Sequence, residues 1–302
     1  PIVNYGAGKV FNTTRSKVSQ SRNQYDSYTW DSYATYKKLF AENHNVEATV
    51  GMTVIKNWGN GLSGTGYDVP YNSWDFADIS QTTGLGTGND NSSYTYDNRL
   101  LSYFGRLQYD FKGKYLLSAM FRRDGSSAFD KEYRIDHFKS VTAGWKISEE
   151  NFLKNNSTID FLKLRGSYGT LGNLVGNDLY KALLNGEATY VFDGALTNGQ
   201  ALGALPNKIA KWETAEKLDI GLDAKLFGNK LEVVADYFLE DRIDLLIPGL
   251  PISGIFGTTA PGSGAPTVNA GTTRSEGYEL QLTYNDEISE NLSFNVSYNV
   301  TK

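Results

Sequence analysis

The feature that most limits what this chain can fold into is a strict two-residue alternation of apolar and polar side chains. In one segment the apolar members are Leu218, Ile220, Leu222, Ala224 and Leu226. The residues between them are Lys217, Asp219, Gly221, Asp223 and Lys225. A helix would mix the two sets around its circumference, whereas a strand places them on opposite faces. The pattern therefore predicts a β-strand with one apolar and one charged face.

The same alternation recurs along the chain in segments of about ten residues, which is the spacing of a strand-rich fold. Short Gly- or Asn-containing turns such as 112–114 and 227–230 join neighbouring segments, as in β-hairpins. We therefore expect about ten antiparallel strands. They cover residues 28–38, 46–54, 101–111, 115–122, 141–147, 162–168, 218–226, 231–239, 278–284 and 292–300.

The connections between these segments alternate in length. Short turns are followed by long stretches rich in Gly, Asn, Ser, Thr and Tyr, which cover residues 56–97, 123–136, 172–211 and 244–272. Outer-membrane barrels have short periplasmic turns and long extracellular loops. A ten-residue strand tilted by about 45° rises roughly 23 Å, close to the height of the apolar band of such a barrel. The pattern favours an antiparallel transmembrane β-barrel in which the four stretches are extracellular loops.

Composition excludes several other classes. The 302 residues include no Cys and only 2 His, and the formal net charge is -5. These counts exclude a disulfide scaffold and give Cys- or His-based metal and catalytic sites little to use. A nucleic-acid partner is not expected, because such proteins need a basic face. The sequence contains no apolar run of about 18 residues, so no transmembrane helix is predicted. The mean hydropathy of -0.42 does not exclude a barrel, because the hydropathies of its lipid-facing and lumen-facing residues average to a polar value.

Alternation alone does not separate a barrel from a soluble β-sandwich. In a sandwich the apolar face meets a second sheet, whereas in a large barrel it meets lipid. Segment length and loop asymmetry favour the barrel. Tyr109, Phe111 and Tyr115 also cluster beside the 112–114 turn, as an interfacial aromatic girdle would, although ordinary strand aromatics would look the same.

Several sequence blocks resemble one known family. They are YDNRLLSYFGRL at 96–107, RDGSS at 123–127, SVTAGWKISEE at 140–150, LKLRGSYG at 162–169, WET at 212–214, NAG at 269–271 and EGYEL at 276–280. In this order they resemble the barrel of SusC/RagA-type TonB-linked outer-membrane proteins. The resemblance covers residues from about 96 to the end, and before that mainly the hairpin at 36–52.

The resemblance implies a bacterial outer-membrane importer and no enzyme. Family members have a 22-stranded barrel, a plug and a TonB-binding segment, and a SusD-like surface lipoprotein closes over them. They take up oligosaccharides or peptides using the TonB complex, with no cofactor. We expect this chain to be a cut piece of such a barrel, without the plug or the terminal strands. The alternatives are a passive porin or adhesin barrel and a soluble carbohydrate-binding β-sandwich.

Aromatic side chains in the long loops are the candidates for substrate contact. Their faces suit the apolar sides of sugar rings, and the Asp and Asn side chains beside them suit sugar hydroxyls. Packing between loops would use the same residues. These candidates are Trp58, Tyr71, Trp74, Phe76, Tyr94 and Tyr190. The candidates for the polar face that lines the lumen are Arg106, Arg122, Arg165, Asp223 and Asp236. We expect the lumen-facing set to form charge networks or to contact the plug.

No catalytic or metal site is predicted. The adjacent carboxylates at 149–150 and 240–241 point apart in a strand or turn, so they do not form an acid–base pair. Asn89, Asp90 and Asn91 could contribute to a Ca²⁺ loop, but the full ligand spacing is missing and a plain turn is favoured. His44 and His137 are expected at the surface.

Overall fold

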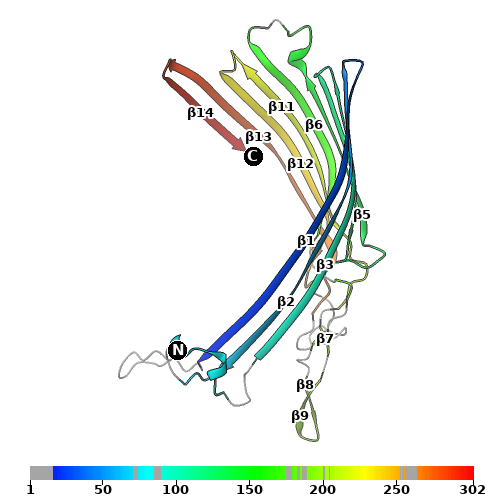
Figure 1. The fold of residues 1–302 in the computed structure, drawn as a ribbon, viewed down its shortest axis with the longest axis vertical. Helices are drawn as coiled ribbons and strands as arrows, with labels where there is room; N and C mark the ends of the chain where they lie inside the picture. Colours follow the sequence, from blue (N-terminus) through cyan, green and yellow to red (C-terminus); the bar gives the residue numbers. More distant parts are fainter. Residues whose placement is uncertain are drawn as a thin grey trace. The chain divides into compact units, whose positions relative to one another are not determined.

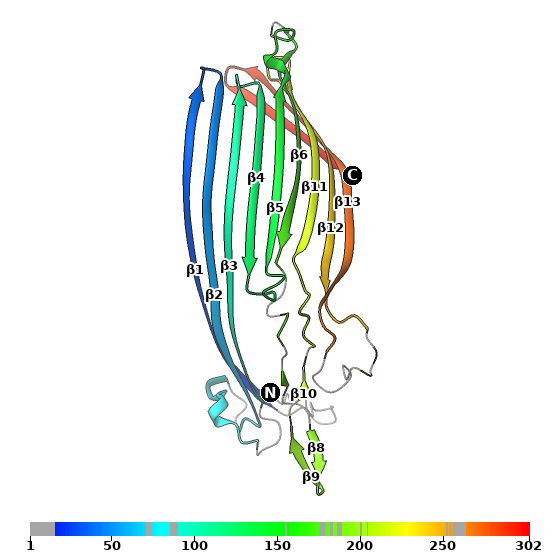
Figure 2. The same ribbon diagram turned by 90° about the vertical axis from the view of Figure 1, so that its right-hand side faces the viewer.

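The computed structural model describes residues 16–70, 74–84, 90–154, 156–174, 179–181, 184–185, 189–199, 201–203, 205–251, 253, 255 and 264–302. Its main feature is a ten-stranded sheet in the order β1-β2-β3-β4-β5-β6-β11-β12-β13-β14 (Figures 1 and 2). All pairs from β3 to β14 are antiparallel. The prediction of an all-β antiparallel fold with about ten strands is confirmed.

The ten strands vary widely in length. They are β1 (Lys17–Phe40), β2 (His44–Tyr67), β3 (Asp90–Phe111), β4 (Tyr115–Ser126), β5 (Ile135–Lys146), β6 (Ile159–Asn173), β11 (Glu213–Leu226), β12 (Leu231–Ile247), β13 (Val268–Ser289) and β14 (Leu292–Thr301). Two small sheets pair β7 (Leu184–Asn185) with β10 (Ala201–Leu202) and β8 (Thr189–Phe192) with β9 (Ala195–Asn198). Within the described residues the helices are short 3-10 turns, namely η1 (Trp74–Phe76), η2 (Ile79–Gln81) and η3 (Ile147–Glu149). None of the helices in these described ranges could span a membrane.

The predicted loop boundaries were too wide. Strands β2 and β3 leave only residues 68–89 of the predicted 56–97 loop, and β4 and β5 leave only 127–134 of 123–136. The other two connections run from 174 to 212, with four small strands inside, and from 248 to 267. The strands continue past the point where the apolar alternation stops, because backbone pairing does not require one apolar face.

The short turns have the backbone that a tight hairpin requires. Between β3 and β4, Lys112 and Gly113 adopt positive φ angles of 56° and 68°. The Asp110 carboxylate accepts a hydrogen bond of 2.6 Å from the Gly113 N–H. Glycine suits this position because of its φ angle, since an added Cβ would meet nothing within 4 Å.

Strand register gathers the predicted apolar residues on one face, which we call the apolar face. Leu218 lies opposite Tyr168 on β6 and Leu239 on β12, and Ile220 lies opposite Tyr237. This face is not covered by any described residue, since Ile220 and Tyr168 are each 48% exposed. A sandwich would bury these side chains under a second sheet, so the sandwich alternative is wrong for this sheet.

The chain divides into two compact units. The first comprises residues 1–29 and 55–99, and the second comprises residues 30–54 and 100–302. Strands β1, β2 and β3 each contribute one segment to each unit. The second unit holds a small apolar core, made of Ala128, Phe129, Phe138, Ala210, Trp212 and Leu246. This core joins the β4–β5 connection to the segment that leads into β11.

Candidate functional site

The five predicted lumen-facing residues occupy one face of the second unit, which we call the polar face. The cross-strand pairs that establish this are Arg106–Met120, Met120–Ser140, Arg122–Phe138, Gly144–Arg165, Arg165–Gly221 and Gly221–Asp236. Asp223 lies two residues from Gly221 on the same strand and therefore shares the face. The pairing of the strands thus places the five residues on one face of the sheet. That this face lines a channel is part of the function proposed below.

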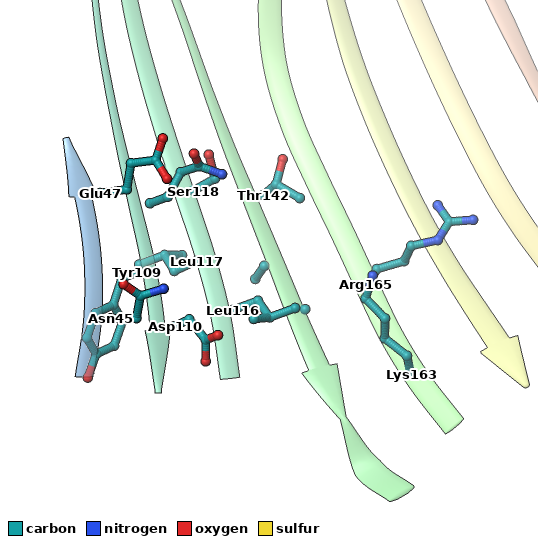
Figure 3. A pocket seen from close by; sticks show the side chains of 13 residues that line it. Asn45, Glu47, Tyr109, Asp110, Leu116, Leu117, Ser118, Thr142, Lys163 and Arg165 are labelled. Carbon is teal, nitrogen blue, oxygen red and sulfur yellow. The ribbon is translucent and has the colours of Figure 1, made fainter. Parts of the chain in front are cut away.

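A hollow of about 350 Å³ lies on the polar face at the turn end of β3 to β6 (Figure 3). Polar members of its lining are Asn45, Glu47, Gln108, Asp110, Ser118, Thr142, Lys163 and Arg165. Lys163 and Arg165 both project from β6 in the close-up view. Among the described residues Lys163 has no ion-pair partner. The hollow therefore offers hydrogen-bonding groups to water or to another part of the protein.

Arg165 is the centre of an ion cluster that spans three adjacent strands. Its guanidinium contacts Asp219 at 2.9 Å, Asp223 at 3.2 Å and Asp236 at 2.5 Å. The side chains are 13–36% exposed, so the cluster is partly screened by solvent. One guanidinium holds three carboxylates, and its planar set of N–H donors allows this geometry. The predicted members Arg165, Asp223 and Asp236 thus come together, and Asp219 completes the set.

Gly221 leaves the space through which Arg165 reaches across β11 to Asp236. A Cβ at this position would lie 2.2 Å from an Asp236 carboxylate oxygen and 2.5 Å from Arg165 Cζ. No side chain fits there without moving one partner. The glycine is therefore required by the approach of two charged side chains.

Replacing Gly221 with Ala should weaken this cluster. The added methyl group displaces the Arg165 guanidinium from Asp236, and losing this partly screened ion pair costs about 1 kcal/mol. The measurement is guanidinium unfolding of the full-length protein in detergent, followed by tryptophan fluorescence. Gly166→Ala is the matched control, because its Cβ would lie 3.7 Å from the nearest atom. Equal destabilisation by both substitutions would contradict the proposed role of Gly221.

Arg122 and Arg106 differ in their surroundings. Arg122 Nε lies 2.7 Å from the Asp124 carboxylate, and its Nη2 donates to the fully buried Ser102 hydroxyl at 2.8 Å. Within the part of the chain that the structure describes, the Arg106 side chain has only a long contact of 3.5 Å to Ser118 Oγ. Arg122 thus belongs to a structural network, whereas Arg106 is largely available to solvent or to a ligand.

In the first unit three tyrosines form a continuous aromatic cluster, which we call the tyrosine shelf. Its members are Tyr25 on β1 and Tyr94 and Tyr96 on β3, and the centre of the Tyr96 ring lies 6.4 Å from that of Tyr25 and 6.5 Å from that of Tyr94. The Tyr94 hydroxyl lies 2.8 Å from the Tyr25 hydroxyl and donates to Asn23 Oδ1 at 3.2 Å. The hydrogen bond with Tyr25 raises the pKa of Tyr94 above its usual value, so the phenol stays neutral at physiological pH.

Two glycines of β2 let the rings of the shelf approach its backbone. An added Cβ at Gly61 would lie 2.3 Å from Tyr94 Cε1, and one at Gly59 would lie 2.9 Å from Tyr96 Cε1. The rings therefore lie directly over the bare backbone of β2, as aromatic residues do over strand glycines. Tyr25 and Tyr94 remain 66% and 44% exposed, so the shelf presents ring surface to the solvent.

Trp58 lies on the opposite face of the first unit from the shelf. It precedes Gly59 in the strand, and successive side chains of a strand point to opposite faces. On its own face the Lys56 ammonium lies 4.7 Å from the Trp58 ring centre and 3.5 Å from Asp97. Hydrogen bonds from Arg99, with a smaller contribution from Lys56, lower the pKa of Asp97 to about 2. Trp58 and Tyr94 therefore cannot line one binding surface.

The remaining aromatic candidates are dispersed. Trp74 lies in η1 and is 92% exposed, and Phe76 ends the same helix. Tyr190, on β8 in the second unit, is 67% exposed and lies 4.9 Å from Phe192. Tyr71 lies outside the described residues. Tyr25 was not among the predicted residues, although the Gly-x-Gly pattern at 59–61 inside an extended segment signals rings that pack over β2.

Three of the four carboxylates considered for catalysis, Glu150, Glu240 and Asp241, are held by other side chains. Glu150 accepts hydrogen bonds from Tyr115 at 2.6 Å and Trp145 at 3.2 Å. Asp241 is paired with Arg274 at 2.6 Å, and Glu240 is paired with Lys217 at 2.9 Å. No group of three or more potential metal ligands occurs in the described part of the chain. Asn89 lies outside the described residues.

The two histidines make different contacts. The Nδ1 atom of His44 lies 2.7 Å from the Tyr109 hydroxyl oxygen, within hydrogen-bond distance. The His137 ring stacks on Phe121 at 5.7 Å. Neither contact involves a metal ligand set among the described residues.

Solved structures share this fold. The chain superposes on the RagAB peptide transporter with a TM-score of 0.76 at 24% identity, covering 94% of this chain and 31% of that chain. It superposes on the ferripyoverdine receptor of Pseudomonas aeruginosa with a TM-score of 0.55 at 14% identity, covering 94% and 33% of the two chains. These likenesses establish a barrel fold of this kind.

Sequence relatives define the family more closely. TonB-dependent receptor P3 of Formosa agariphila is 31% identical over 90% of this chain and 26% of its own length. TonB-dependent receptor SusC of Bacteroides thetaiotaomicron is 32% identical over 70% of this chain and 21% of its own length. The chain therefore spans about a quarter of these curated relatives. The family model described as TonB dependent receptor-like, beta-barrel matches residues 3–302, and the chain belongs to this family.

Proposed function

We propose that this chain is the wall of a SusC-type importer in the bacterial outer membrane. The observation that carries the proposal is the two-faced sheet of the second unit, apolar and exposed on one face and charged on the other. Lipid around the barrel would cover the apolar face, and water in the channel would meet the polar face. The protein would bind and translocate its cargo, and would not act as an enzyme.

The parts that complete the importer would lie elsewhere in the protein or in other chains. A plug and a TonB-binding segment would come from the rest of the chain, and the TonB complex would supply energy. The structural neighbour RagAB is a peptide transporter, and the sequence relative SusC belongs to the SusC type, so a SusD-like lipoprotein lid is the expected partner. The cargo would be an oligosaccharide or a peptide. The long connections, including residues 68–89, 127–134, 174–212 and 248–267, would face the cell exterior.

Strand length supports an exposed binding surface in the first unit. Strands β1 and β2 each have 24 residues, whereas about ten tilted residues cross the apolar band. The rest of each strand would lie outside the membrane. The tyrosine shelf, with its exposed ring faces, is our candidate contact for cargo there.

The shelf makes a testable contribution to cargo affinity. Tyr94→Ala should weaken cargo binding by roughly three- to tenfold, because one aromatic stacking contact contributes about 0.5–1.5 kcal/mol. The measurement is binding of maltooligosaccharides and of a mixed peptide pool to the full-length protein with its lipoprotein, by calorimetry. The cargo class that binds identifies the substrate.

Trp58→Ala is the control, since it removes an aromatic ring from the opposite face of the same strands. If both variants lose affinity equally, the shelf is not the contact surface. If the wild-type complex binds neither cargo class, the importer assignment fails.

A further inference from the structure

The apolar face carries a small group of cations in an otherwise uncharged region. On strands β3 to β6 this face comprises the odd residues 101–111, 115–125 and 135–145 and the even residues 162–170. Its basic members are Arg123, His137 and Lys139, and within these ranges it contains no Asp or Glu. A face that contacts only acyl chains has no use for uncompensated cations, which are costly in lipid.

The three side chains lie close together. Arg123 on β4 lies directly opposite His137 on β5, a geometry that brings Cβ atoms to about 5 Å. Lys139 follows His137 by two residues, which is roughly 7 Å along the strand. Neither Arg123 nor Lys139 has an ion-pair partner among the described residues. By contrast, Arg274 on the same face is held by both oxygens of Asp241 at 2.6 Å.

An apolar hollow of about 690 Å³ adjoins these cations. Its lining includes Gly105, Leu107, Ala119, Val141 and Tyr168, and Lys139 stands at its edge. Gly105, which has no side chain, lies directly opposite Phe121, and the small Ala119 lies in the row that leads through Val141 to Tyr168. The surface is therefore low beside the larger Phe121 and Tyr168, which are 52% and 48% exposed. The apolar hollow would therefore suit an acyl chain, and the cations beside it would suit an anionic group.

The height of the cations on the sheet fits a lipid headgroup. At the turn end of the same strands, Phe111, Tyr115 and Trp145 form a row of stacked rings with centroids 6.2 and 6.4 Å apart, as at a membrane interface. Arg123 lies eight residues further along β4 than Tyr115. This separation is about 27 Å along the strand and about 20 Å along the membrane normal after tilt. The cations would therefore meet the opposite interface.

We propose that Arg123, His137 and Lys139 bind the phosphate of an anionic lipid whose acyl chain occupies the adjoining hollow. The site rests on the proposed membrane placement but is independent of the cargo. Its specificity comes from charge complementarity, since two cations and a histidine meet one phosphate and residues 101–111, 115–125, 135–145 and 162–170 place no carboxylate on this face. The nearest carboxylate on the face is Glu216 on β11, which lies opposite Thr170 and two strands away from Lys139. Each Lys or Arg near an anionic membrane surface strengthens binding roughly fivefold.

Native mass spectrometry of the full-length protein in detergent tests the site. Palmitoyl-oleoyl phosphatidylglycerol and phosphatidylcholine are the probes, because they share acyl chains and differ in net charge. The wild-type protein should retain phosphatidylglycerol at roughly tenfold lower concentration than phosphatidylcholine. The double variant R123Q/K139Q should reduce this preference to within about twofold.

Two further variants separate the specific site from general effects. R274Q removes a cation that Asp241 already neutralises and should preserve the preference. Ala119→Trp fills the hollow without changing charge and should weaken phosphatidylglycerol binding at least fivefold.

Equal retention of both lipids by the wild-type protein overturns the site, whether or not any variant folds. Loss of the preference in R274Q shows a general charge effect and also overturns it. Displacement of phosphatidylglycerol by millimolar inorganic phosphate shows a free-anion site instead of a lipid site. Cargo binding measured on the same preparation tests the importer separately, so that either proposal can fail alone.

Discussion

Truncation of Trp212 to Ala should destabilise the loop-end core of the second unit by about 3–4 kcal/mol, because a large buried ring is replaced by a cavity. Trp212 is 4% exposed and packs against Phe129 at 5.5 Å and Phe138 at 5.8 Å. Its indole N–H also donates to the Arg134 carbonyl at 3.1 Å. The substitution therefore removes both the apolar contacts and a hydrogen bond that hold the β4–β5 connection.

Limited proteolysis of the full-length protein in detergent measures this loss. Cleavage within residues 127–134 should become much faster in Trp212→Ala, because the connection opens locally while the strands remain paired. Trp74→Ala is the matched control, since this tryptophan is 92% exposed and its loss should not change the cleavage rate at this connection. Unchanged cleavage in Trp212→Ala would show that the core does not hold the connection.

The sheet could be predicted from the sequence because a two-sided environment leaves a period-two pattern in it. Leu218 and Ile220 alternate with charged residues for this reason, and the ten strands appear where such segments were predicted. The pattern ends earlier than the strands do. In β2 beyond Lys56 the sequence is rich in Gly, Ser and Asn, so pairing continues there without an apolar face. A loop was therefore predicted where a strand exists.

The candidate site was predictable only in part. Alternation alone places Arg165 and Asp223 on the polar face, but it does not say that they touch. Contact depends on the register between β6 and β11, which are separated by residues 174–212. A one-residue shift would turn every side chain of a strand to the other face, and a two-residue shift would keep the face but change the partners. The sequence therefore did not reveal Asp219 as a third partner.

The aromatic candidates show the same limit for a different reason. Trp58 and Tyr94 were predicted to lie in one loop, where either could turn toward a ligand. The strands that contain them fix their side chains on opposite faces instead. Tyr25, which was not predicted, joins Tyr94 because β1 pairs beside β2 and the glycines of β2 leave room for the rings.

Replacement of Arg165 with Leu should destabilise the second unit by about 2–3 kcal/mol, since Asp219, Asp223 and Asp236 would lose their shared cation and repel one another. Removing one partner of a fully buried pair costs about 3–5 kcal/mol, and the partial exposure here reduces that cost. The measurement is guanidinium unfolding of the full-length protein in detergent. Arg106→Leu is the control on the same face, because its one described contact is 3.5 Å long, and its effect should stay within about 0.5 kcal/mol.

Adding Asp236→Asn to Arg165→Leu should recover part of the stability by removing one of the repelling charges. Failure of this double variant to recover stability would mean that Arg165 acts by packing, and that the charge balance of the cluster contributes little.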